Sequence, residues 1–70
     1  MSNIPSLTPK DIVRILKQKG FILDRSRGSH QIWLHPVSRK RAVVPVHKKD
    51  LPAGTLYSIL KQAGIDKGEL

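Results

Sequence analysis

The absence of cysteine constrains this chain of 70 residues more than any other feature. A fold this small buries only roughly 60% of its extended surface, and without disulfides it must close one apolar core by packing alone. The missing thiols also exclude cysteine-based zinc sites and a cysteine nucleophile. We therefore expect residues 1–70 to form a single domain whose ligand site is a shallow surface groove rather than a deep cavity.

Positive charge dominates the polar residues: thirteen Lys and Arg against five Asp and Glu give a formal net charge of +8. Such a surface attracts a polyanion, because phosphate neutralisation with counterion release drives non-specific nucleic-acid binding. An acidic protein partner would be attracted as well, so charge alone does not select RNA. No apolar run reaches the ~20 residues of a membrane span, and no signal-peptide pattern is present, so we expect a cytoplasmic protein with no membrane partner.

Strong local signals mark a first helix. Thr8 can cap a helix that begins at Pro9, and Asp11 follows Thr8 by three residues, as in a capping box. We expect this helix over 9–19, ended by Gly20 in the left-handed conformation.

A second helix is predicted to start near 52–55 and to end before Gly64. In both helices the apolar residues at helical spacing should be buried. They are Ile12, Val13, Ile15 and Leu16 in the first helix, and Leu56, Ile59, Leu60 and Ala63 in the second.

Three strands are predicted between the helices. Residues 21–23 form a short strand that the polar run 24–28 ends. Residues 29–35 alternate in polarity, and 41–46 are rich in β-branched valine, with Pro45 at an edge, a bulge or the strand's end. The order helix, three strands, helix predicts a two-layer α+β fold, α-β-β-β-α, in which both helices cover one face of a three-stranded antiparallel sheet.

Alternation in the second strand assigns its side chains to opposite faces of the sheet. We expect Ile32 and Leu34, which share a side with His30, to face the helices. Trp33 would then lie on the open face, available for base stacking or for contact with a protein partner.

His30 is the candidate catalytic residue, because histidine changes charge near neutral pH without special tuning. It follows Arg25, Arg27, Gly28 and Ser29. Guanidinium groups, a hydroxyl and backbone N–H groups at a glycine turn are a combination that holds phosphate. A histidine beside phosphate suits ribose-assisted RNA cleavage, in which the 2′-hydroxyl loses a proton. From spacing alone, an ordinary histidine at the start of a strand remains an open alternative.

Further cations lie near the second helix and in the hairpin. Lys48 and Lys49 precede the helix N-terminus, where an anion would be favoured. His47 beside them fits a phosphate contact and an inert exposed position equally well. The group 39–41 is interpreted as a solvated turn.

We expect no metal and no cofactor. The spacing of His30, His35 and His47 matches no familiar ligand motif. The acids are scattered, which disfavours a two-metal nuclease, and a Gly-rich nucleotide loop is missing.

The chain resembles the HicA toxin family from about Pro9 to Ile65. The segments that carry the resemblance are Arg27-Gly28-Ser29-His30-Gln31-Ile32-Trp33, His35-Pro36, Val44-Pro45-Val46-His47-Lys48-Lys49-Asp50-Leu51-Pro52, Gly54-Thr55-Leu56, Ile59-Leu60 and Ala63-Gly64-Ile65.

The resemblance implies a fold similar to double-stranded-RNA-binding domains and metal-independent cleavage of mRNA by the toxin of a type II toxin–antitoxin system. The family's single active-site histidine follows Gly-Ser, which here is His30, with Gly28 shaping the turn. A HicB-type antitoxin is implied as partner, with a domain that covers the active site, and operator DNA is bound only by the larger assembly.

Two rival functions stay open from the sequence. A non-catalytic module could grip duplex RNA by shape and 2′-hydroxyl contacts, which needs the basic groove but not His30. A protein-interaction subunit would use the charge for an acidic partner and show no salt-sensitive RNA affinity.

Overall fold

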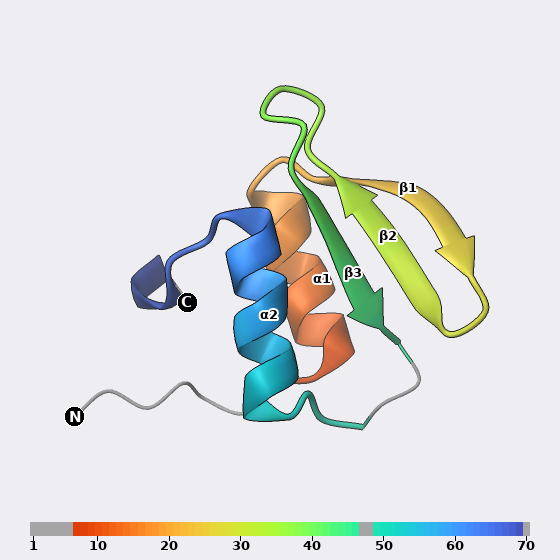
Figure 1. The fold of residues 1–70 in the computed structure, drawn as a ribbon, viewed down its shortest axis with the longest axis vertical. Coiled ribbons are helices and arrows are strands. Elements are labelled where there is room, and N and C mark those ends of the chain that lie inside the picture. Colours follow the sequence, from red (N-terminus) through yellow and green to blue (C-terminus); the bar gives the residue numbers. More distant parts are fainter. Residues whose placement is uncertain (1–6, 47–48, 70) are drawn as a thin grey trace.

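A computed structural model describes residues 7–46 and 49–69 (Figure 1). The elements are α1 (Pro9–Gln18), β1 (Ile22–Arg27), β2 (His30–Leu34), β3 (Arg41–Pro45), α2 (Ala53–Ala63) and the short 3₁₀ helix η1 (Lys67–Glu69). The strands form an antiparallel sheet in the order β1-β2-β3, and both helices pack against β3. The α+β fold of α-β-β-β-α order is confirmed. No helix among the described residues is long and apolar enough to cross a membrane.

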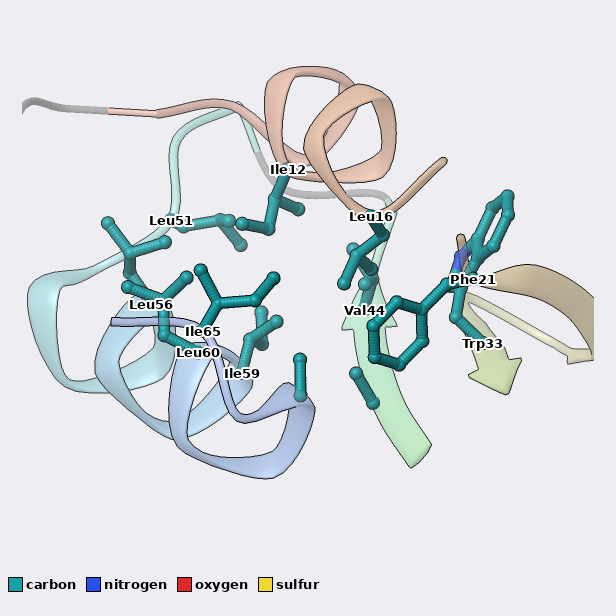
Figure 2. Packing of buried hydrophobic residues seen from close by; sticks show 12 residues of the cluster. Ile12, Leu16, Phe21, Trp33, Val44, Leu51, Leu56, Ile59, Leu60 and Ile65 are labelled. Atoms are coloured by element: carbon teal, nitrogen blue, oxygen red, sulfur yellow. The ribbon is translucent and has the colours of Figure 1, made fainter. Parts of the chain in front are cut away.

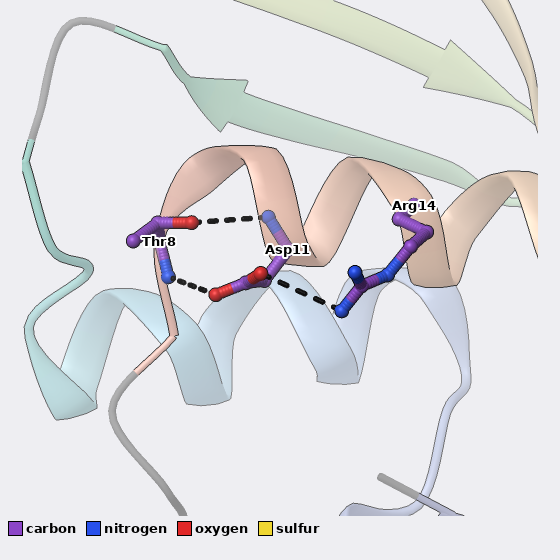
Figure 3. Close-up of polar contacts among 3 residues, drawn as sticks. All are labelled: Thr8, Asp11 and Arg14. Carbon is purple, nitrogen blue, oxygen red and sulfur yellow. Dashed lines mark hydrogen bonds and ion pairs between the residues drawn. The ribbon is translucent and has the colours of Figure 1, made fainter.

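Helix α1 begins with the capping box expected from the sequence (Figure 3). The Thr8 hydroxyl accepts a hydrogen bond from the Asp11 backbone N–H at 3.1 Å, and the Asp11 carboxylate accepts one from the Thr8 N–H at 3.0 Å. Two N–H groups that the helix itself leaves without partners are thereby satisfied. Gly20, with φ of 94°, turns the chain from α1 toward β1.

The core lies between the two helices and the face of the sheet that they cover (Figure 2). The predicted buried stripes of both helices contribute to it, with Val13 and Ile15 partly buried at its margin. From the sheet and the segments around it come Phe21, Trp33, Ala42, Val44, Leu51 and Ile65.

The polar run after Leu23 was expected to end the first strand, and this prediction is wrong. β1 continues to Arg27, because its backbone pairs with β2 along its whole length. All six of its residues are exposed, since β1 lies at the edge of the sheet farthest from the helices. The pairing register shifts between Leu23 and Arg25, which makes Asp24 the extra residue of a β-bulge.

The expected orientation of β2 is also wrong. Trp33 is 4% exposed in the core, whereas Ile32 and Leu34 are half-buried on the open face. The Trp33 Nε1–H donates to Gln31 Oε1 at 3.3 Å, and Lys17 Nζ lies 5.9 Å from the centre of the indole ring. The large indole is thus accommodated in the core with its one polar atom hydrogen-bonded.

Candidate functional site

A tight hairpin turn joins β1 to β2 and presents the start of β2. Gly28 has φ of 58°, and Ser29, the second loop residue, has no positive φ. These are the φ signs of a type II′ turn, which matches the twist of the flanking strands. No atom of the described residues lies within 4 Å of a Cβ added at Gly28, so the positive φ of Gly28 is what favours glycine there. The Ser29 carbonyl accepts from the Val46 N–H at 2.8 Å, which ties the turn to the end of β3.

His30 is exposed and is the first residue of β2. In the sheet register it stands opposite Arg27 of β1 and Pro45 of β3. Directly opposite residues share a face, with Cβ atoms about 4.5–5.5 Å apart. Trp33 occupies the helix side of β2, so alternation puts His30 on the open face, which neither α1 nor α2 covers. The imidazole is therefore exposed, with a guanidinium-bearing residue as its cross-strand neighbour.

Strand alternation puts a second arginine on the same face. Counting back from the turn, Arg27 and Arg25 face the open side, and Arg25 stands opposite Ile32. The Arg25 Nε lies 3.4 Å from the Asp24 carboxylate, but the Arg25 side chain is still 61% exposed. Within residues 7–46 and 49–69, no carboxylate forms an ion pair with Arg27.

Arg41 is a further cation of this face, although the sequence pattern favours a solvated turn for residues 39–41. It starts β3 opposite Leu34, so it lies about 13 Å along the sheet from His30, at roughly 3.3 Å per residue. The alternation of β3 indicates this position of Arg41: Ala42 and Val44 are apolar and buried, so the residues that alternate with them face outward. Apolar side chains between these cations form the floor of the face: Ile22, Ile32, Leu34 and Val43.

The other sequence-predicted cationic residues come from the segment between β3 and α2. Lys49 is exposed in the bend before α2. His47 and Lys48 lie outside the described residues.

His35 lies on the helix side at the far end of β2. Its Nδ1 accepts hydrogen bonds from the N–H groups of Val37 and Ser38, at 3.2 and 3.1 Å, and its ring packs edge-to-face on Phe21 at 5.2 Å. These contacts order the β2–β3 connection. Within the described part of the chain, no three His, Asp or Glu residues gather closely enough to hold a metal ion.

Comparison with known proteins assigns the chain to a family. A family model described as the HicA toxin of bacterial toxin–antitoxin systems matches residues 9–65. The matched segment runs from the first residue of α1 to just beyond α2, so it contains the whole sheet and every residue of the open face. No curated protein matches the chain.

Proposed function

The chain belongs to the HicA toxin family of bacterial toxin–antitoxin systems, and from this membership and the open face we propose that it is a metal-independent endoribonuclease that cleaves mRNA with His30 as its catalytic residue. The observation that carries the proposal is the position of His30. Its exposed imidazole stands directly after a tight turn, opposite Arg27 and on the face of the sheet that neither α1 nor α2 covers.

The proposed reaction combines groups of this face with solvent water. The His30 imidazole acts either as general base for the 2′-hydroxyl proton or as general acid toward the 5′-oxygen, and water carries out the other proton transfer. The 2′-oxygen bonds to phosphorus and the bond from phosphorus to the 5′-oxygen breaks, which leaves a 2′,3′-cyclic phosphate and a 5′-hydroxyl. Arg27 and Arg25 offset the negative charge that develops on the phosphorus-bound oxygens.

RNA binding follows from the same surface. Gly28 and Ser29 offer backbone N–H groups and a hydroxyl to the phosphate, and we propose Lys49 as a further RNA contact, together with His47 and Lys48, which precede it in the sequence. The net charge of +8 supports a polyanionic substrate. We place the protein in the cytoplasm, where mRNA is translated.

As a toxin of this family, the chain has an antitoxin partner. We propose that this partner is of the HicB type and binds over the open face, where half-buried Ile32, Leu34 and Val43 offer apolar contact area between the arginines. Operator DNA would be bound only by the toxin–antitoxin complex.

The test compares the wild type with His30→Ala on a defined mRNA fragment in the presence of a chelator. We expect cleavage to fall by roughly 10²–10⁴-fold, the usual contribution of a positioned acid or base. Circular dichroism and gel shifts should show that the variant folds and still binds RNA. Arg27→Ala should also slow cleavage, whereas Lys61→Ala, which removes one exposed positive charge on α2, serves as its matched control.

Three outcomes would count against the proposal. Cleavage by His30→Ala at the parental rate would remove the catalytic assignment. A chelator that stops the wild type would contradict a metal-independent reaction. A gel shift without scission by the wild type would favour the non-catalytic duplex-binding module.

A further inference from the structure

A hollow lies on the other side of the sheet from His30, between the first turn of α1 and the ends of β2 and β3. Its volume is about 260 Å³, and its lining residues are Pro9, Lys10, Val13, Gln31 and Val46. This volume is below the roughly 300–1,000 Å³ of pockets for drug-sized ligands, so the hollow suits one planar group. None of its residues belongs to the proposed catalytic face.

The Gln31 side chain gives this hollow a defined polarity. The Trp33 indole nitrogen can only donate, so the Gln31 atom that it meets at 3.3 Å must be the carbonyl oxygen. The Gln31 amide nitrogen is thereby fixed on the other side of the group, with two N–H donors. Within residues 7–46 and 49–69, these donors have no protein acceptor.

The remaining walls supply apolar surface and one charge. Pro9, Val13 and Val46 are buried or half-buried and offer carbon atoms to a flat ring. Lys10 is exposed on the first turn of α1 and brings an ammonium group to the rim. Apolar walls, a fixed donor and a cation at the rim complement a nucleotide, which combines a flat ring, acceptor atoms on its edge and a phosphate.

The hollow is joined directly to the backbone that carries His30. Gln31 is the next residue of β2, and Val46 donates its N–H to the carbonyl of Ser29, the residue before His30. A strand of RNA that passes over this end of the sheet meets the imidazole on one face and the hollow on the other.

We propose that this hollow is a base subsite for a nucleotide next to the scissile phosphate, with Gln31 as its specificity-determining residue and Lys10 as its phosphate contact. The inference rests on the proposed function, because it assumes an RNA substrate. The Gln31 carbonyl oxygen is engaged by Trp33, so Gln31 presents its N–H donors and selects a base edge rich in acceptors, such as the keto edges of uracil and guanine, over the amino groups of cytosine and adenine.

The test measures binding of short labelled oligo(U) and oligo(A) to the full chain carrying His30→Ala, which prevents cleavage. We expect tighter binding of oligo(U). Adding Gln31→Glu keeps an acceptor for Trp33 but replaces the donors, and should lower the ratio of oligo(U) to oligo(A) affinity by roughly 2- to 12-fold, the net effect of a hydrogen bond.

Gln18→Glu is the matched control, because it makes the same charge change at an exposed position at the end of α1. It should weaken both oligonucleotides alike and leave the ratio unchanged. Lys10→Ala should weaken both as well and reduce the salt slope of binding by about 1.

Equal affinity of the His30→Ala protein for the two oligonucleotides, or a ratio that Gln31→Glu leaves intact, would overturn the subsite. The subsite would also be overturned if Gln31→Glu changed only the affinity for the antitoxin, because the group that occupies the hollow would then be a side chain of the partner. A failure of the catalytic proposal is detected by a different measurement, namely the cleavage rates of the wild type and of His30→Ala, both of which retain Gln31.

Discussion

Replacing Trp33 with alanine tests which side of β2 belongs to the core. The side chain is 4% exposed and its indole N–H donates to Gln31. Substituting alanine for a buried aromatic of this size costs about 3–5 kcal/mol of unfolding free energy, because it leaves a cavity. Ile32 is half-buried on the opposite face, so Ile32→Ala should cost about 1–2 kcal/mol, well below the range for fully buried aliphatics.

These costs are large for a chain of 70 residues, whose total stability is expected at about 4–10 kcal/mol. At about 4–8 °C per kcal/mol, Trp33→Ala should lower the Tm by roughly 12–40 °C, and Ile32→Ala by roughly 4–16 °C.

Urea and thermal unfolding followed by circular dichroism would measure both variants, because Trp33→Ala removes the only tryptophan and its fluorescence. An Ile32→Ala protein less stable than Trp33→Ala would refute this assignment of the two faces.

Three further predictions concern caps, turns and pH. Thr8→Ala should lower the unfolding free energy by about 1 kcal/mol in urea titrations, because the Asp11 N–H loses its acceptor. Gly28→Ala should cost roughly 1–2 kcal/mol, since φ is 58°, whereas a synthetic chain with D-alanine there should keep its stability. Hydrogen bonds from Thr8, the backbone one foremost, lower the pKa of Asp11 below its ordinary 3.8. A lowered pKa stabilises the fold above the unfolded-state pKa, so the stability advantage of wild type over Asp11→Asn should shrink as pH falls below about 3.8.

Both helices could be predicted from the sequence because their signals are local. Thr8 and Asp11 are three residues apart and form the cap without help from the rest of the chain. Gly64 ends α2 with φ of 70°, as Gly20 ends α1. The apolar residues predicted to be buried between these ends lie in the core or pack against it, because helical spacing alone indicates which residues share a face.

The orientation of β2 could not be read in this way because both of its faces carry apolar residues. Ile32 and Leu34 outnumber Trp33, and a count of apolar residues favours the wrong face. The polar neighbours of Trp33 fit the covered side through specific contacts: Gln31 accepts from the indole, and His35 packs on Phe21. Such contacts depend on the assembled structure and have no local pattern.

The extension of β1 through the polar residues 24–27 could not be predicted for a similar reason. Residues 24–27 have little strand propensity, but their backbone groups pair with β2, and the two-residue turn at Gly28 sets the register. The adjacency of Arg25, Arg27 and His30 was foreseeable, because a tight turn keeps neighbours in sequence together. That both arginines share the face of His30 was not, since it requires β1 to continue through the polar residues 24–27 and to pair with β2.

The burial of Trp33 and the exposure of His30 are one structural fact. The two residues are three apart on a single strand, so alternation puts them on opposite faces, and burying one exposes the other. Had Ile32 and Leu34 faced the helices, His30 and its cross-strand neighbour Arg27 would have faced them too, and the imidazole would have been turned away from the open face. The same alternation puts Gln31 on the helix side, where the hollow lies. In β2, the side chain that stabilises the core therefore also determines which face can perform chemistry and which can receive a base.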